Sequence, residues 1–213
     1  MTLTIMMRHG RAGNNVQRIL AGRVLEFHLT EEGREQVKST AESLKDANIK
    51  AVYSSPITRV RESAEIICKE LSLGYTIDDR LIEIDAGRLT GLNYYEAMER
   101  YQDIFKKFYE DRDPIIDALK IERFSKVKER VRSMLDYIAD KHKDENVLLV
   151  THLDPIKAAI SDILNLNGNV LFDLDIPNAS LTILKHGSKH SLLAMNVMKI
   201  DRYINYSKPA LTL

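Results

Sequence analysis

Short apolar runs alternate along the chain with segments whose apolar residues recur every three or four positions. Residues 2–7 and 51–53 are apolar and β-prone, and a helical pattern follows each, beginning near Thr30 in the first case and after Ser55 and Pro56 in the second. Serine is a good helix N-cap and proline suits the first helical position, so this pair is expected to open the second helix. The order strand, helix, strand, helix is typical of a parallel α/β sheet.

The middle of the chain follows a different pattern. From residue 94 to about residue 143 it is densely charged, with twelve acidic and twelve basic residues between Glu99 and Glu145, and its apolar residues from Phe124 to Ile138 fall on one helix face. Mixed charges of this kind are typical of solvated helix faces. We therefore expect a helical insertion or cap at about residues 93–145.

The strand and helix pattern then returns. Residues 147–151 form a continuous apolar run of the kind that a buried parallel strand needs, and Asp154 is expected to cap the following helix. Two more β-prone runs, at residues 180–184 and 191–197, are expected to complete the sheet. The predicted fold class is α/β, a three-layer sandwich with a mostly parallel central sheet flanked by helices, in a single domain of residues 1–213.

Composition narrows the class of protein. Hydrophobic residues make up 44% and charged residues 29% of the 213 positions, which excludes disordered and fibrous proteins. The 31 Lys and Arg balance the 31 Asp and Glu, so we expect no nucleic-acid partner and no membrane partner. One cysteine, Cys68, excludes a disulfide framework and a Cys-rich metal site. A cytoplasmic protein is the expectation.

Two histidines stand where a ligand site is expected. Ligands of open α/β sheets bind outside the carboxyl ends of the strands, and His9 and His152 each follow a predicted strand. The first 25 residues contain four arginines and no carboxylate, and Arg59 lies in the first turn of a helix. Arginine suits phosphate and carboxylate oxygens, so an anion site is predicted. Arg18 and Arg23 are equally compatible with ordinary surface positions.

The ordered set of these residues resembles a known family. Arg8-His9-Gly10 followed by Asn15 resembles the R-H-G-x-x-x-x-N signature of the histidine phosphatase superfamily, also called the phosphoglycerate mutase-like family. Three later segments resemble its other motifs: Ser54 to Arg59, Arg80 to Glu83, and Val150 to His152. The resemblance runs from residue 3 to about residue 184 and is weakest over 94–143.

The resemblance implies a role for each matching residue. His9 would be the nucleophile that forms a phosphohistidine, and Glu83 would be the general acid that protonates the leaving group and then the base that activates water. Arg8, Asn15, Arg59 and a protonated His152 would bind the phosphoryl oxygens. No metal ion and no cofactor is expected, because the arginines and the histidinium supply the positive charge.

The general acid has two competitors. Asp85 lies two residues from Glu83, and Asp154 lies just after His152. In the acid phosphatase branch of the family the donor directly follows the second histidine, where this chain has Leu153. We therefore assign the role to Glu83 and interpret Asp154 as a helix cap.

The reaction class also has alternatives. The mutase branch carries a Leu-Asn-Lys continuation and an arginine pair in its insertion, whereas here Leu92-Asn93 is followed by Tyr94 and the insertion holds no adjacent arginines. We predict a metal-independent phosphomonoester hydrolase acting on a small phosphorylated metabolite. A cofactor-dependent phosphoglycerate mutase and a catalytically silent phospho-ligand binding protein are the alternatives.

Aromatic residues of the insertion have two interpretations. We expect these residues to pack in the core of the insertion, and the alternative is that they line the mouth of the site. They are Tyr94, Tyr95, Phe105, Phe108 and Tyr109. The sheet edge and the insertion also offer surfaces for a homodimer.

Overall fold

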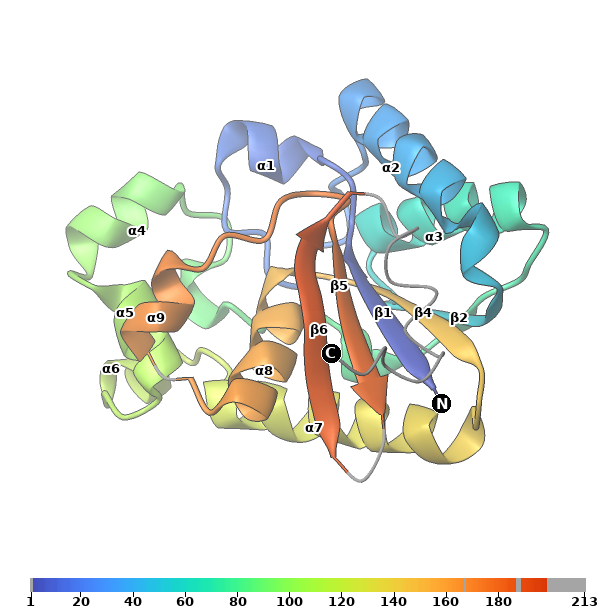
Figure 1. Ribbon diagram of the computed structural model, residues 1–213. Helices are drawn as coiled ribbons and strands as arrows, with labels where there is room; N and C mark the ends of the chain where they lie inside the picture. Colours follow the sequence, from blue (N-terminus) through green and yellow to red (C-terminus); the bar gives the residue numbers. More distant parts are fainter. Residues whose placement is uncertain (1, 167, 187–188, 199–213) are drawn as a thin grey trace.

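A computed structural model describes residues 2–166, 168–186 and 189–198. Within these residues, six strands form one mixed sheet in the order β3-β2-β4-β1-β5-β6 (Figure 1). The strands are β1 (Leu3–Arg8), β2 (Ile49–Ser54), β3 (Thr76–Ile77), β4 (Asn146–Thr151), β5 (Leu181–His186) and β6 (His190–Val197). Strands β1 to β4 are mutually parallel, and β5 and β6 are antiparallel to their neighbours. The predicted α/β class with a mostly parallel sheet is confirmed.

One strand was not predicted. The edge strand β3 has only two residues and both are exposed, so it lacks the apolar run that identifies the other strands. Its pairing with Tyr53 and Ser54 of β2 is what defines it.

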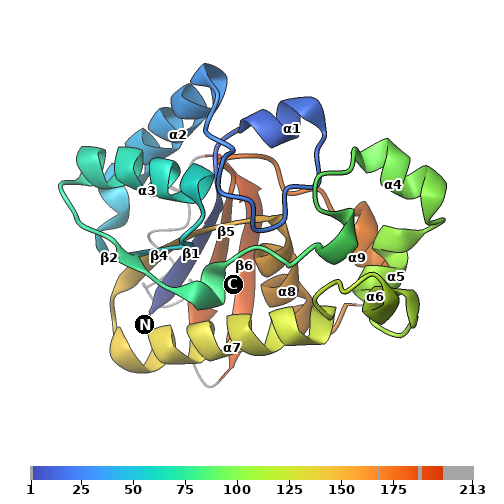
Figure 2. The ribbon, with the colours of Figure 1, turned by 180° about the vertical axis from the view of Figure 1, so that it is seen from behind.

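Helices cover both faces of the sheet. Helices α2 (Glu31–Leu44) and α3 (Thr58–Leu71) lie on one side, and α7 (Phe124–Lys141) and α8 (Leu153–Leu164) lie on the other (Figures 1 and 2). Side chains alternate along β1 accordingly: Ile5 and Met7 belong to the core beneath α2 and α3, and Met6 belongs to the core beneath α7 and α8. The sheet is buried on both faces, which explains its continuous apolar runs.

The segment predicted as an insertion divides into two parts. Three short helices, α4 (Tyr94–Arg100), α5 (Ile104–Glu110) and α6 (Ile115–Ala118), stand beyond the sheet together with α9 (Gly168–Asp173), at the left of Figure 1. Both parts contribute to the apolar cluster that contains Tyr53 and Leu149 of the strands, but helix α7 lies with α8 against one face of the sheet (Figures 1 and 2). Only the first part therefore lies outside the three layers. None of the helices in the described part of the chain is long and apolar enough to cross a membrane.

Several local predictions need correction. Helix α2 begins as expected with Thr30 as N-cap, but α3 begins at Thr58, so Ser55 and Pro56 precede the helix rather than open it. The N-cap of α8 is His152, and Asp154 makes no capping bond. The loop expected after the first strand contains a short helix, α1 (Gly13–Gln17). Single-turn 3₁₀ helices occur at Lys45–Ala47, Asp79–Leu81 and Gly87–Leu89.

The loop after β1 is pressed against the first turn of α2. The backbone N–H and hydroxyl of Thr30 both donate to the Arg11 carbonyl oxygen, at 2.9 and 3.2 Å. A Cβ atom on Gly33 would lie 2.0 Å from that same oxygen, which is closer than any atom tolerates. Only glycine at position 33 permits this approach, and the approach fixes the loop that follows His9.

Replacing Gly33 with alanine should therefore destabilise the protein by about 2 kcal/mol or more, although alanine is the better helix former by about 1 kcal/mol. Urea unfolding of Gly33→Ala measures this. Gly74→Ala is the matched control, because a Cβ there meets no atom within 4 Å, and its free energy of unfolding should stay within about 0.5 kcal/mol of wild type. Equal stabilities for the two variants would contradict the packing described.

Candidate active site

The predicted site residues converge at one edge of the sheet. Because β1, β2 and β4 are parallel, their carboxyl ends meet there, and the chain enters β5 at the same edge since β5 runs antiparallel to β1. A cavity of about 450 Å³ opens at this edge and is lined by five of the six predicted residues: Arg8, His9, Asn15, Arg59 and Glu83. The sixth, His152, is fully buried directly behind Arg59.

His9 is held in one tautomer. Its Nδ1 lies 2.7 Å from the carbonyl oxygen of Gly10, which can only accept a proton, so Nδ1 carries the hydrogen. Its Nε2 accepts from the Nε of Arg59 at 3.3 Å. Burial, with help from Arg59 and Arg8, lowers the pKa of His9 well below its usual value. His9 is therefore neutral, with the lone pair of Nε2 beside a guanidinium group.

Arg59 is the central cation of the site. Its side chain is buried, with 1% of the residue exposed, and it donates to the carbonyl oxygens of Gly22 at 2.9 Å and Val24 at 3.2 Å. It also reaches His9 and the Nδ1 of His152, each at 3.3 Å. Burial lowers the pKa of Arg59 to about 10, so it stays charged at neutral pH.

His152 differs from the expectation of a protonated imidazole. Burial and the charge of Arg59 lower the pKa of His152 well below its usual value. Its Nδ1 accepts from Arg59, which leaves Nε2 to donate to the Ser55 hydroxyl at 2.9 Å. The Ser55 hydroxyl thus contacts a residue far away in the sequence. The two imidazole rings meet edge to face, with centroids 5.4 Å apart.

Glu83 stands across the cavity as a neutral acid. Burial raises its pKa to about 8, with the Asp154 carboxylate adding to the rise and Arg59 opposing it. Its Oε1 accepts the backbone N–H of Ile84 at 3.0 Å, and its Oε2 lies 3.8 Å from His152 Nδ1. At neutral pH the Glu83 carboxyl group, which lies close to His152, is therefore mostly protonated.

Asn15 contributes through its amide nitrogen. Its Oδ1 already accepts the Ala12 N–H at 3.0 Å and the Nδ2 of Asn178 at 3.4 Å, so a contact with an anion has to come from its own Nδ2. Arg8, whose pKa burial lowers, is anchored by a bond to the Ile176 carbonyl.

The four arginines of the first 25 residues have different surroundings. Arg8 and Arg18 line the cavity, and Arg18 lies against Tyr95 at its rim. Arg11 pairs with Glu32 on the surface. Arg23 pairs with Glu122 and donates to the backbone carbonyl of Glu83, so it positions the loop and lies outside the cavity.

The two competitors of Glu83 are placed differently. Asp85 is exposed, accepts the Gly87 N–H at 2.9 Å and does not line the cavity. Asp154 does line it, and its Oδ1 accepts the hydroxyl proton of Tyr109 at 2.7 Å. The interpretation of Asp154 as a helix cap is therefore wrong: its carboxylate points toward Tyr109 because that residue of α5 closes over the start of α8.

Sequence reasoning missed Asn14 and Asn178. Both line the cavity, and Asn178 donates to the backbone carbonyl of His9 at 3.0 Å. Asn178 immediately precedes the fifth strand, and the direction of that strand decides which sheet edge it reaches. A pattern of apolar residues carries no information on direction, so only the pairing could identify Asn178.

The arrangement suits transfer of a phosphoryl group. A neutral imidazole with an unprotonated Nε2, two arginines and a protonated carboxyl group face one cavity. Among the described residues, no group of three or more His, Cys, Asp and Glu side chains is arranged to hold a metal ion.

Comparisons with known proteins agree with this geometry. The sequence profile of the histidine phosphatase superfamily (branch 1) matches residues 4–197. A 2,3-bisphosphoglycerate-dependent phosphoglycerate mutase of Thermoplasma acidophilum is 36% identical over 186 residues, which are 86% of this chain and 87% of the mutase. Phosphoserine phosphatase 1 of Hydrogenobacter thermophilus is 27% identical over 92% of this chain and 93% of its own length.

A solved structure gives the same result. The mycobacterial glucosyl-3-phosphoglycerate phosphatase in complex with VO3 superimposes with a TM-score of 0.81 at 25% identity, and the match covers 92% of this chain and 98% of that chain. The similarity thus extends over both the sheet and its surrounding helices.

The raised pKa of Glu83 predicts a pH-dependent stability. Between its usual pKa and about 8 the unfolded chain has lost the proton that the folded chain keeps, so the free energy of unfolding falls as pH rises. The slope from this group is at most about 1.4 kcal/mol per pH unit. Glu83→Gln removes this titrating group. In urea unfolding, the free energy of unfolding of the variant relative to wild type should therefore increase from pH 5 to pH 7.5. Asp85→Asn changes an exposed carboxylate and is the control: its free energy of unfolding should depend on pH as that of wild type does. The same pH dependence in Glu83→Gln would contradict the raised pKa of Glu83.

Proposed function

The chain belongs to branch 1 of the histidine phosphatase superfamily, and we propose that it is a metal-independent phosphomonoester hydrolase acting through a phosphohistidine on a small phosphorylated metabolite. The observation that carries the proposal is the pair of neutral groups on one cavity. His9 presents the lone pair of Nε2, and Glu83 holds a proton at neutral pH. A nucleophile and a general acid are the two groups that this reaction requires.

The first step transfers the phosphoryl group to His9. Its Nε2 attacks phosphorus in line, the bond from phosphorus to the ester oxygen breaks, and Glu83 gives its proton to the leaving alkoxide. The Gly10 carbonyl accepts the Nδ1 hydrogen at 2.7 Å and so stabilises the positive ring that forms. The product is a phosphohistidine together with a free alcohol.

The second step hydrolyses the phosphohistidine. Glu83, now a carboxylate, accepts a proton from water as the water oxygen attacks phosphorus, and the bond between phosphorus and Nε2 breaks. Phosphate leaves, His9 regains its lone pair, and Glu83 is again protonated. The residue that acted as an acid in the first step acts as a base in the second.

The phosphoryl charge is matched by cations at the sheet edge. Arg8 and Arg59 face the cavity and bind nonbridging oxygens, with Asn15 as a neutral donor. His152 is neutral in the free protein, and a dianion beside it raises its pKa, so it gains its proton when substrate binds. Its positive charge then adds to that of Arg59, behind which it lies.

The mutase relative supports a second candidate function. A mutase returns the phosphoryl group from the histidine to a second position of a sugar acid, and it must hold a carboxylate while it excludes water. The 36% identity to the Thermoplasma enzyme supports this reading. Tyr94, an uncharged side chain at the cavity wall where the mutase branch has lysine, favours hydrolysis.

Turnover of p-nitrophenyl phosphate in the presence of a chelator tests the proposal. With substrate labelled on phosphorus, wild type should release phosphate and, after quenching in alkaline detergent, which preserves a P–N bond, carry a labelled phosphohistidine. His9→Ala should show neither because it lacks the nucleophile. Mutase activity stimulated by 2,3-bisphosphoglycerate with negligible hydrolysis would favour the second candidate. The absence of a phosphoenzyme in wild type would indicate a silent binding protein.

The leaving group tests Glu83. For an alkyl phosphate, Glu83→Gln should lower kcat/KM by about 10²–10⁴, and wild-type kcat/KM should fall as pH rises through about 8. The loss on p-nitrophenyl phosphate should be far smaller, because p-nitrophenolate leaves without a proton. Asp85→Asn is the control and should match wild type on both substrates. Equal losses of Glu83→Gln on both substrates would refute the acid role.

A further inference from the structure

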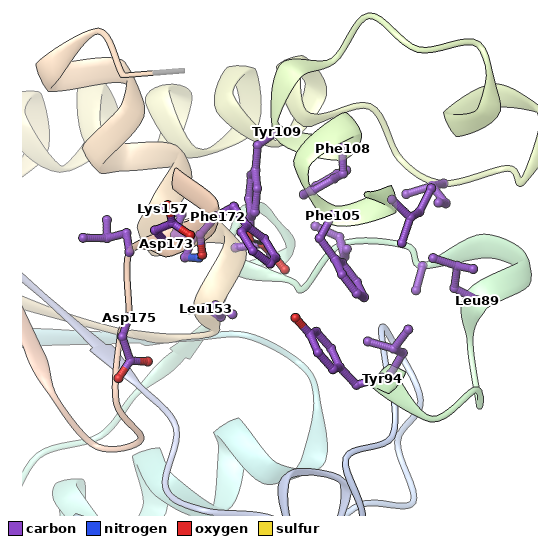
Figure 3. Close-up of a pocket in the computed structure, with 17 residues that line it drawn as sticks. Leu89, Tyr94, Phe105, Phe108, Tyr109, Leu153, Lys157, Phe172, Asp173 and Asp175 are labelled. Atoms are coloured by element: carbon purple, nitrogen blue, oxygen red, sulfur yellow. Dashed lines mark hydrogen bonds between the residues drawn. The ribbon is translucent and has the colours of Figure 1, made fainter. Parts of the chain in front are cut away.

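A second cavity adjoins the phosphoryl site and has a different chemical character. Its volume is about 320 Å³, and its walls are mainly aromatic and aliphatic (Figure 3). Tyr94 and Phe105 lie stacked with ring centroids 4.8 Å apart on one side, and Phe108 and Tyr109 of α5 approach from another (Figure 3). Phe108 and Tyr109 are buried in the core cluster and Phe105 packs against it, as expected from the sequence, and these three residues and Tyr94 also line this cavity.

The two cavities share a boundary. Six residues line both of them: Leu20, Ile84, Ala86, Tyr94, Leu153 and Asp154. Four of the six are aliphatic, and Ile84 directly follows Glu83 in the chain and donates its backbone N–H to that carboxyl group. The group that protonates the leaving oxygen therefore lies next to this boundary, on the side where the organic part of a substrate must extend.

Charges around the second cavity disfavour another anion. Asp154, Asp173 and Asp175 are among its lining residues, and Lys157 is the lysine among them. The Nζ of Lys157 already donates hydrogen bonds to the carbonyl oxygens of Leu171 at 2.6 Å and Phe172 at 3.3 Å. It also lies 4.9 Å from the ring centroid of Tyr109. A carboxylate or second phosphate on the substrate would meet acidic side chains without a cation to bind it.

We propose that this cavity binds the organic part of the substrate, and that this part is a neutral, apolar alkyl or aryl group. The proposal rests on the proposed function, since it takes the phosphoryl group to be bound by Arg8 and Arg59. Pockets of about 300 Å³ and more, with mostly apolar walls, are the size that holds a small organic ligand. Phosphoserine and 3-phosphoglycerate, with their charged groups, should be poor substrates.

A series of straight-chain alkyl phosphates tests this directly. Methyl, butyl, hexyl and octyl phosphate are used below their micelle-forming concentrations, and the leaving alkoxides from butyl to octyl are chemically equivalent. Each methylene that leaves water should raise kcat/KM by about fourfold until the cavity is full. O-phosphoserine and 3-phosphoglycerate should fall below butyl phosphate.

Variants locate the effect in the cavity. Phe105 is half-buried on the cavity wall, and Phe105→Asn should lower the ratio of kcat/KM for octyl over methyl phosphate by at least about fivefold. Leu174→Asn, on another wall, provides a second test if Phe105→Asn fails to fold. Phe27→Asn is the matched control, because Phe27 is also half-buried but lines neither cavity, and it should keep the wild-type ratio.

The outcomes separate the two proposals. Suppose that the protein hydrolyses p-nitrophenyl phosphate but kcat/KM for the alkyl phosphates does not depend on the length of the alkyl chain. This result, or a higher kcat/KM for phosphoserine or 3-phosphoglycerate than for the alkyl phosphates, would overturn the apolar substrate class and leave the hydrolase proposal standing. A chain-length dependence that Phe105→Asn and Leu174→Asn both retain would overturn the cavity assignment. Failure to hydrolyse any phosphomonoester would overturn both proposals.

Discussion

The buried guanidinium of Arg59 is the interaction on which the rest of the site depends. Taking a cation out of water costs several kcal/mol unless its donors find partners, and the carbonyl oxygens of Gly22 and Val24 supply them. The same group reaches both His9 and His152, and burial together with its charge holds both imidazoles neutral. One side chain thus orders the loop after α1 and contributes to the protonation state of both histidines.

The two adjoining cavities are built from different parts of the fold. The strand ends carry Arg8, His9 and His152, which the three-layer core holds in place. Part of the wall of the second cavity comes from α5 and α9, which stand outside those layers (Figure 1), and part comes from α8 within them. Segments outside the layered core tolerate change better than the core does, so the α5 and α9 part of the wall can change without disturbing His9.

Much of this architecture follows from local patterns, and the exceptions have physical reasons. The apolar runs and their polar ends locate the strands and place His9 and His152 correctly. Ser55 and Asp154 look like helix caps, but each is engaged by a distant partner, the His152 imidazole and the Tyr109 hydroxyl. Such tertiary bonds override local capping preference. His152 is neutral in the free protein for a related reason: burial lowers its pKa, and a strand end does not reveal burial.

The central position of β1 has a consequence for how the chain acquires its structure during synthesis. β1 lies between β4 and β5, so its partners begin at residues 146 and 181. At cellular elongation rates, on the order of ten seconds separate the appearance of β1 from that of β4. Throughout this interval the apolar strand leading to His9 has no neighbour in the sheet. The surroundings of His9 are therefore complete only when nearly all of the described chain has been synthesised.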